Sequence, residues 1–107
     1  MLNKIRLCNT DEVASDLPLC VNPEGYPAIA VYNLDGNYFA TDDLCTHGSA
    51  SLSEGYQEGD EITCPFHGGA FNIKTGVATA FPCREALQCY PLLVEDRIIY
   101  INLEKTT

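Results

Sequence analysis

The stretch that decides the fold begins with Cys45-Thr46-His47-Gly48 and ends with Cys64-Pro65-Phe66-His67-Gly68-Gly69. Each end carries one cysteine and one histidine at short spacing, and residues 48–63 separate the two pairs. The chain has no other histidine, so both of its imidazoles belong to this constellation. Thiolates and neutral imidazoles together bind zinc or an iron–sulfur cluster. We therefore predict a metal centre with four ligands, which are Cys45, His47, Cys64 and His67.

The order of the ligands along the chain helps to separate these two metals. Zinc sites with two cysteines and two histidines usually take both cysteines from one arm and both histidines from the other. Here each arm carries one ligand of each kind. A two-iron cluster suits this order, because one iron can take both sulfurs while the other takes both imidazoles. A structural zinc module with the same four ligands stays open as an alternative.

The two ligand pairs resemble the signature of the Rieske 2Fe-2S proteins, in which Cys-x-His and, after a similar spacer, Cys-x-x-His hold the cluster. The stretch from Thr75-Gly76 to Phe81-Pro82 looks like the proline-containing loop that covers the cluster in that family. The resemblance covers essentially the whole chain and is closest to the ferredoxins of bacterial aromatic-ring-hydroxylating dioxygenase systems. It implies that the two cysteines hold one iron and the two histidines the other.

This resemblance also implies a function. The chain would accept one electron at a time from a flavin-dependent ferredoxin reductase and deliver it to a terminal ring-hydroxylating oxygenase. An oxygenase itself would need a further iron held by two histidines and a carboxylate, and the chain has no third histidine for such a site. We therefore expect electron transfer without catalysis. A small Rieske subunit of another reductase, such as nitrite reductase, stays open as an alternative.

Departures from the high-potential branch of the family predict a low reduction potential. In Rieske proteins of respiratory cytochrome complexes, an extra cysteine in each loop forms a disulfide, and serine and tyrosine hydroxyls donate hydrogen bonds to the cluster. The matching positions here supply neither group, since they are Ala50, Phe66, Gly69 and Phe71. Mixed cysteine and histidine ligation spans about −150 to +300 mV, so we expect a value of about −150 mV.

The remaining cysteines have no second ligand at short spacing, and they are Cys8, Cys20, Cys83 and Cys89. Such cysteines are usually small buried apolar residues, and we expect packing roles for all four. No export signal is recognisable, so a reducing compartment would keep them as thiols. Because no apolar run is long enough to span a membrane, we expect a soluble cytoplasmic protein.

The charge of the chain is strongly acidic. Six Lys and Arg residues against fifteen Asp and Glu residues give a net charge of −9, and no cationic residue lies between Arg6 and Lys74. This argues against nucleic acid and anionic membranes as partners. The surface charge either merely keeps the protein soluble or steers the cluster toward basic patches on redox partners. The acidic residues nearest the ligand pairs are Asp42, Asp43, Glu54, Glu58, Asp60 and Glu61.

Short apolar segments between turn residues predict an all-β fold, a Rieske-like antiparallel β sandwich or barrel. Strands over 28–33 and 37–41 would flank the hairpin signal Asp35-Gly36. A second hairpin would join strands over 87–94 and 97–103 about Glu95-Asp96.

At 107 residues the chain is predicted to form a single domain, residues 1–107, with no room for a second function. A loop-rich cluster-binding lobe over about residues 43–82 would be inserted into a β scaffold formed by 1–42 and 83–107. Size and charge favour a monomer.

Four aromatic residues lie near the ligands in the sequence, and they are Tyr56, Phe66, Phe71 and Phe81. We expect them to pack the lobe and keep water away from the cluster, whereas an exposed one would be a docking contact. The glycines next to the ligands, Gly48, Gly68 and Gly69, would allow the backbone to approach the cluster closely. The resemblance implies that both histidines reach the surface, where their outer ring nitrogens offer the electron its exit.

Overall fold

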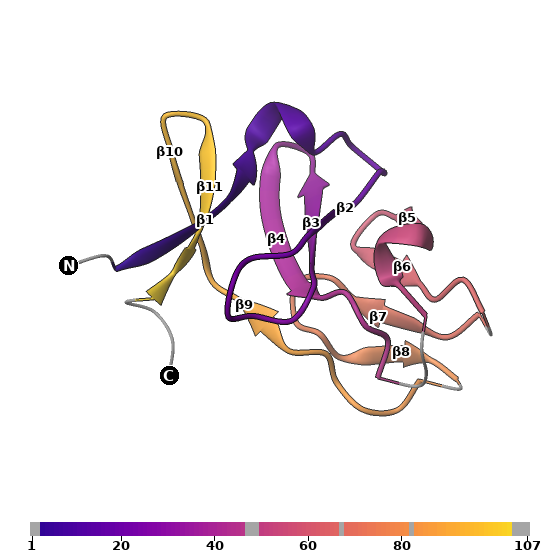
Figure 1. Cartoon of the computed structure of the whole chain (residues 1–107). Helices are drawn as coiled ribbons and strands as arrows, with labels where there is room; N and C mark the ends of the chain where they lie inside the picture. Colours follow the sequence, from indigo (N-terminus) through magenta and orange to yellow (C-terminus); the bar gives the residue numbers. More distant parts are fainter. Residues whose placement is uncertain (1–2, 47–49, 67, 82, 104–107) are drawn as a thin grey trace.

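The computed structural model describes residues 3–46, 50–66, 68–81 and 83–103 and is shown in Figure 1. Antiparallel strands arranged in three sheets make up about half of this part of the chain, and helical segments are few and short, which confirms the predicted all-β fold. Its two helical segments are short 3-10 turns, η1 (Thr10–Glu12) and η2 (Leu52–Glu54). Within the described ranges, no helix has the length and apolar character needed to cross a membrane.

The first sheet brings the two ends of the chain together in the order β1-β11-β10. Its strands are β1 (Lys4–Asn9), β10 (Leu92–Glu95) and β11 (Ile98–Asn102). Side chains alternate along the central strand, so that Ile99 and Ile101 point into the core. In β1 a bulge shifts the register between Arg6 and Cys8, and the adjacent residues Leu7 and Cys8 are both buried.

The second sheet has the order β2-β3-β4-β9. Its strands are β2 (Leu19–Val21), β3 (Ile29–Leu34), β4 (Asn37–Asp42) and β9 (Cys89–Tyr90). The predicted hairpin at Asp35-Gly36 is confirmed, with φ of 52° and 88° at these two residues. Positive φ at both positions is typical of the two-residue turns whose twist matches that of the paired strands.

The predicted strand over residues 87–94 is wrong as one element. It is divided at Pro91 into β9, which pairs with β4, and β10, which pairs with β11. Proline has no backbone N–H to donate to a strand ladder, so the chain changes sheets at this residue. The hairpin that follows is confirmed, and its turn holds Asp96 and Arg97 at φ of 52° and 65°.

The third sheet is a meander of four strands in sequential order, β5-β6-β7-β8. The strands are β5 (Tyr56–Glu58), β6 (Glu61–Thr63), β7 (Ala70–Asn72) and β8 (Ala78–Ala80). They lie within the segment predicted to be loop-rich. The sequence did not reveal them, because strands of three residues are too short to show a clear alternation of polar and apolar side chains. The division of the chain into lobe and scaffold stays a prediction.

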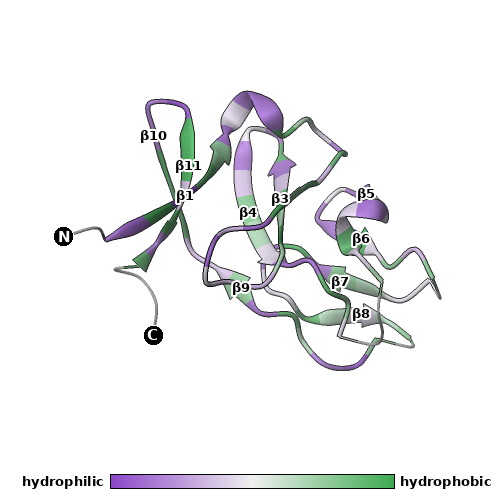
Figure 2. Ribbon diagram, in the orientation of Figure 1, coloured by the Kyte–Doolittle hydropathy of each residue, from purple (hydrophilic) through white to green (hydrophobic). Residues whose placement is uncertain are grey.

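Strand β3 forms a wall between two hydrophobic cores, because its successive side chains point to opposite faces. The scaffold core consists of Leu7, Cys8, Val13, Ile29, Val31, Ala40, Ile99 and Ile101. The ligand core consists of Ala30, Tyr32, Cys45, Ala50, Leu52, Ile62, Cys64, Phe71, Ile73, Cys83 and Leu87. Figure 2 shows the apolar residues in green along β11 and in β6, on the two sides of this wall. Two of the predicted ligands therefore lie in a packed core.

Candidate metal centre

Two loops carry the predicted ligands, one after β4 and the other between β6 and β7. The backbone N–H of Cys45 donates to the carbonyl oxygen of Ala50 at 3.0 Å. In the same way the N–H of Cys64 donates to the carbonyl oxygen of Gly69 at 2.6 Å. Each cysteine therefore opens a loop that is closed by a hydrogen bond to the fifth residue after it. The two closed loops therefore have the same length, and their cysteines occupy equivalent positions.

Both cysteine side chains of these loops are buried, with 2% of each residue exposed. They belong to the ligand core, where Ile62 and Phe71 are also fully buried. The two loops thus place two sulfur donors at matching positions, and both sulfurs are shielded from solvent. This arrangement fits the iron of a mixed-ligand cluster that is held by two cysteines. The apolar core behind the two sulfurs excludes water from that side.

The other two predicted ligands, His47 and His67, lie outside the described residues, as do Gly48 and Pro82. Among the residues that the structure does describe, no group of three Cys, His, Asp or Glu side chains is arranged to hold a metal ion. The described part of the site therefore supplies two sulfur donors, and the histidine half of the predicted ligand set stays a prediction.

A buried carboxylate anchors the first ligand loop. Asp43 accepts a hydrogen bond from the backbone N–H of Ser53 at 2.8 Å and another from the hydroxyl of Ser51. Its carbonyl oxygen also accepts from the N–H of Leu52 at 2.7 Å. These bonds hold the two ends of the loop together and satisfy the buried carboxylate. The grouping of Asp43 with the surface acidic residues is therefore wrong, since only 5% of it is exposed.

A third cysteine lies in the site, where the sequence analysis did not expect one. The Sγ atom of Cys83 lies 3.7 Å from that of Cys45, and the residue is 6% exposed. Burial, followed by its hydrogen bond with Cys45, raises the pKa of Cys83 to about 12. The signal that could have found it is its place directly after Phe81-Pro82, in the stretch assigned by resemblance to the covering loop.

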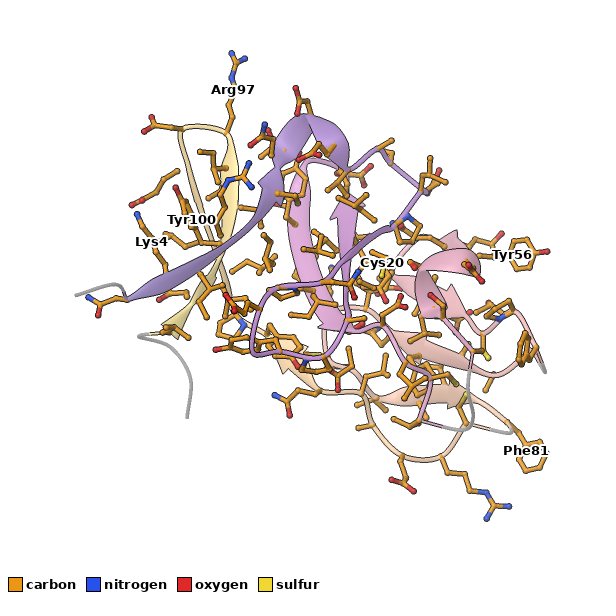
Figure 3. The ribbon with its side chains drawn as sticks, in the orientation of Figure 1. Lys4, Cys20, Tyr56, Phe81, Arg97 and Tyr100 are labelled. Atoms are coloured by element: carbon orange, nitrogen blue, oxygen red, sulfur yellow. The ribbon has the colours of Figure 1, made fainter. Side chains whose placement is uncertain are left out.

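Of the other three cysteines outside the ligand pairs, Cys8 is buried, Cys89 is half-buried and Cys20 is exposed. The expected packing role is therefore wrong for Cys20, which is labelled in Figure 3. All three are free thiols.

The absence of a side chain at Gly69 makes room for Cys83. A Cβ atom built at Gly69 would lie 2.4 Å from the Sγ of Cys83 and 3.0 Å from its backbone nitrogen. Gly68 has a different requirement, since its φ is +75° and nothing lies near its missing Cβ. The hydroxyl of Thr46 donates to the carbonyl oxygen of Glu85 at 2.8 Å. The segment that begins at Cys83 is thus hydrogen-bonded to the first ligand loop and packs against Gly69 of the second.

The stretch predicted to be a covering loop, residues 75–82, is only partly a loop. Gly76 lies in the turn between β7 and β8, and residues 78–80 form β8. This turn packs closely on the following segment, since a Cβ at Gly76 would lie 2.5 Å from the carbonyl oxygen of Leu87. Phe81 follows this strand, and Pro82, the last residue of the stretch, lies outside the described residues.

The expected packing of the aromatic residues is confirmed only for Phe71, which is fully buried. It is wrong for Tyr56, Phe66 and Phe81, which are 73%, 66% and 76% exposed. Figure 3 shows Tyr56 and Phe81 pointing outward at the end of the molecule opposite to Lys4 and Tyr100. The guanidinium of Arg84 lies 5.5 Å from the centre of the Phe81 ring. Exposed rings near a binding site are candidates for contact with another protein.

The acidic residues near the ligand loops differ in exposure. Asp42 accepts a hydrogen bond from the hydroxyl of Tyr90 at 2.5 Å, and Glu61 accepts one from the hydroxyl of Thr79 at 2.6 Å. Both carboxylates are only half exposed. The exposed acidic residues of this end are Glu54, Glu58 and Asp60, which follow one another along η2, β5 and the next turn.

Comparison with known proteins places these features in context. Residues 3–91 match the family model described as the Rieske [2Fe-2S] domain. The ferredoxin component of the p-cumate 2,3-dioxygenase system of Pseudomonas putida is 46% identical over 101 residues, which cover 92% of this chain and 85% of that protein.

Two solved structures are similar along nearly their whole length. The ferredoxin of Sphingomonas yanoikuyae B1 superposes with a TM-score of 0.91 at 52% identity, covering 94% of this chain and 98% of that one. A chain from the complex of reduced oxygenase and oxidized ferredoxin in carbazole 1,9a-dioxygenase has a TM-score of 0.88 at 39% identity, covering 98% and 97%.

Proposed function

Because the chain belongs to the Rieske [2Fe-2S] domain family and binds the cluster of that family, we propose that it is the ferredoxin of an aromatic-ring-hydroxylating dioxygenase system. Two similar proteins support this proposal. One is named as the ferredoxin component of such a system, and the other belongs to a complex of an oxygenase with its ferredoxin. The match extends over nearly the full length of both chains, so it is not restricted to the ligand loops.

In this proposal Cys45 and Cys64 hold one iron, and His47 and His67 hold the other. When bound, the cluster stores a single electron at a potential set by its mixed ligands. The observation that carries the assignment is the matched closure of the two loops behind two buried sulfurs. The chain contributes a dry apolar wall on the sulfur side, through residues such as Phe71.

The proposed partners are a flavin-dependent ferredoxin reductase, which supplies the electron, and a terminal oxygenase, which receives it. The exposed rings of Phe66 and Phe81 adjoin the second ligand pair and the segment of Cys83 in sequence. Apolar contacts of this kind, with exposed acidic residues nearby, suit a short-lived complex that orients the cluster and then separates. A monomeric, cytoplasmic carrier is part of the same proposal.

The cluster assignment is tested by electron paramagnetic resonance of the dithionite-reduced protein. We expect a signal with an average g value below that of an all-cysteine cluster. The variants H47A and H67A should lose this signal, whereas the control C20A, which changes an exposed cysteine outside the ligand pairs, should keep it. Purified protein that is folded, colourless and stoichiometric with zinc would contradict the assignment.

The carrier function is tested by electron delivery. The protein, a flavin-dependent ferredoxin reductase and the oxygenase of the p-cumate system are mixed without air, and reduction of the oxygenase is followed by its absorbance. We expect the rate to rise in proportion to the concentration of this chain. A rate equal to that of reductase and oxygenase alone would show that the chain does not serve as their carrier.

A further inference from the structure

Cys83 lies beside a proposed cluster ligand, although it belongs to neither ligand pair. Its Sγ lies 3.7 Å from the Sγ of Cys45, a distance at which a thiol can donate a weak hydrogen bond to another sulfur. Both residues are buried, with exposed fractions of 6% and 2%. Water therefore does not compete for this contact from the solvent side.

The direction of the hydrogen bond follows from the chemistry of the two sulfurs. A cysteine that binds iron does so as a thiolate, which has no proton, so Cys45 can only accept. An ordinary thiol is mostly protonated near neutral pH, so Cys83 has a proton to give. The donor is therefore Cys83, and the acceptor is the Sγ of Cys45.

The surroundings hold this thiol in place. Gly69 leaves the space that the sulfur occupies, since a Cβ there would lie 2.4 Å from the Sγ of Cys83. The N–H of Cys83 donates to the carbonyl oxygen of Ala80 at 3.1 Å, which ties the segment to β8. Beyond Cys83, the bond between Thr46 and Glu85 ties it to the first ligand loop. These contacts hold the backbone of Cys83 beside the first ligand loop.

We propose that Cys83 tunes the cluster by donating its S–H hydrogen bond to the Sγ of Cys45. The inference rests on the proposed role of Cys45 as a ligand. A hydrogen bond to a cluster sulfur stabilises the reduced form more than the oxidised form, because reduction adds negative charge to the acceptor. The effect is a more positive midpoint potential than the same chain would have without this thiol. The donor thus comes from a third segment, while the positions in the ligand loops that carry donors in the high-potential branch carry none.

The first test uses the unaltered holoprotein. An infrared difference spectrum between its oxidised and reduced forms is recorded in the S–H stretching region, where few other protein groups absorb. We expect one S–H band to move to lower frequency on reduction, because its acceptor becomes more negative. Reduction that is complete by electron paramagnetic resonance but moves no S–H band overturns the inference and leaves the carrier function intact.

The second test compares variants by redox titration. C83A should lower the midpoint potential and remove the moving band, and C83S, which restores a donor, should lie above C83A. The matched control is C8A, which removes the same atom from a buried cysteine of the scaffold core and should change neither readout. Equal midpoint potentials for the unaltered protein, C83A and C83S overturn the inference. If C83A does not retain its cluster, the band of the unaltered protein decides alone.

Discussion

The two hydrophobic cores each bury a cysteine outside the ligand pairs, and the surroundings of these two residues differ. Cys8 is 3% exposed and packs in the scaffold core among Val, Ile and Leu side chains, and its burial raises its pKa to about 11. Cys83 is 6% exposed in the ligand core, with its Sγ 3.7 Å from that of Cys45. Nearly equal burial therefore accompanies different roles. The neighbours of a buried cysteine, rather than its burial, distinguish packing from function.

The largest expected effect comes from removing a ligand from the ligand core. C64A should abolish the visible absorbance and the resonance signal of the reduced protein, because one sulfur of the proposed centre is lost. The scaffold core should remain folded, and this is checked by hydrogen exchange at the amides of Ile99 and Ile101 in β11. Iron content in C64A equal to that of the unaltered protein would remove Cys64 from the ligand set.

A cavity in the scaffold core should lower the stability of the protein but leave the cluster unchanged. Ile99 is fully buried there, so I99A should lower the free energy of unfolding by about 2–5 kcal/mol, as measured by denaturant titration. The midpoint potential and the resonance spectrum should not change, because β3 separates this core from the ligands. I98A, at a half-buried position on the same strand, is the control and should cost less. A shifted potential in I99A would mean that the two cores are coupled.

A smaller effect is expected from filling the space beside Cys83. G69A would place a Cβ 2.4 Å from the Sγ of Cys83, so we expect a loss of stability of about 1–3 kcal/mol and a more negative midpoint potential. G68A is the matched control, because its Cβ would meet no atom and its cost comes only from the positive φ. Both are compared by denaturant and redox titration. A potential that moves equally in the two variants would assign the shift to backbone strain instead.

The smallest expected effect concerns the exposed acidic residues. E58Q/D60N should slow association with a basic redox partner by a few-fold at low salt, and the difference should vanish at high salt. The control D11N/D96N makes the same change in charge away from the third sheet, and the expected change in its rate is smaller. Stopped-flow measurements of electron transfer across a series of salt concentrations compare the pairs. Identical salt dependence in both would reduce these residues to a role in solubility.

Much of this architecture was predictable because its signals are local. Asp35-Gly36 indicated a hairpin, since the two residues accept positive φ and lie between two short apolar segments. The ligand spacing indicated the family, because each pair lies within one short loop. By contrast, the strand predicted over 87–94 failed at Pro91, and the buried state of Asp43 depended on hydroxyl and amide donors several residues away.

The sequence by itself determined the all-β class and the two hairpins, and it pointed to the four proposed ligands, because each of these signals depends on residues close together in the chain. Only the tertiary structure decided which cysteine side chains are in contact. Cys45 and Cys83 are 38 residues apart, and they touch because the segment after β8 folds back onto the first ligand loop. The same packing placed Phe71 inside and Phe81 outside. Contacts of this kind depend on how separate segments pack together, and no local pattern records that.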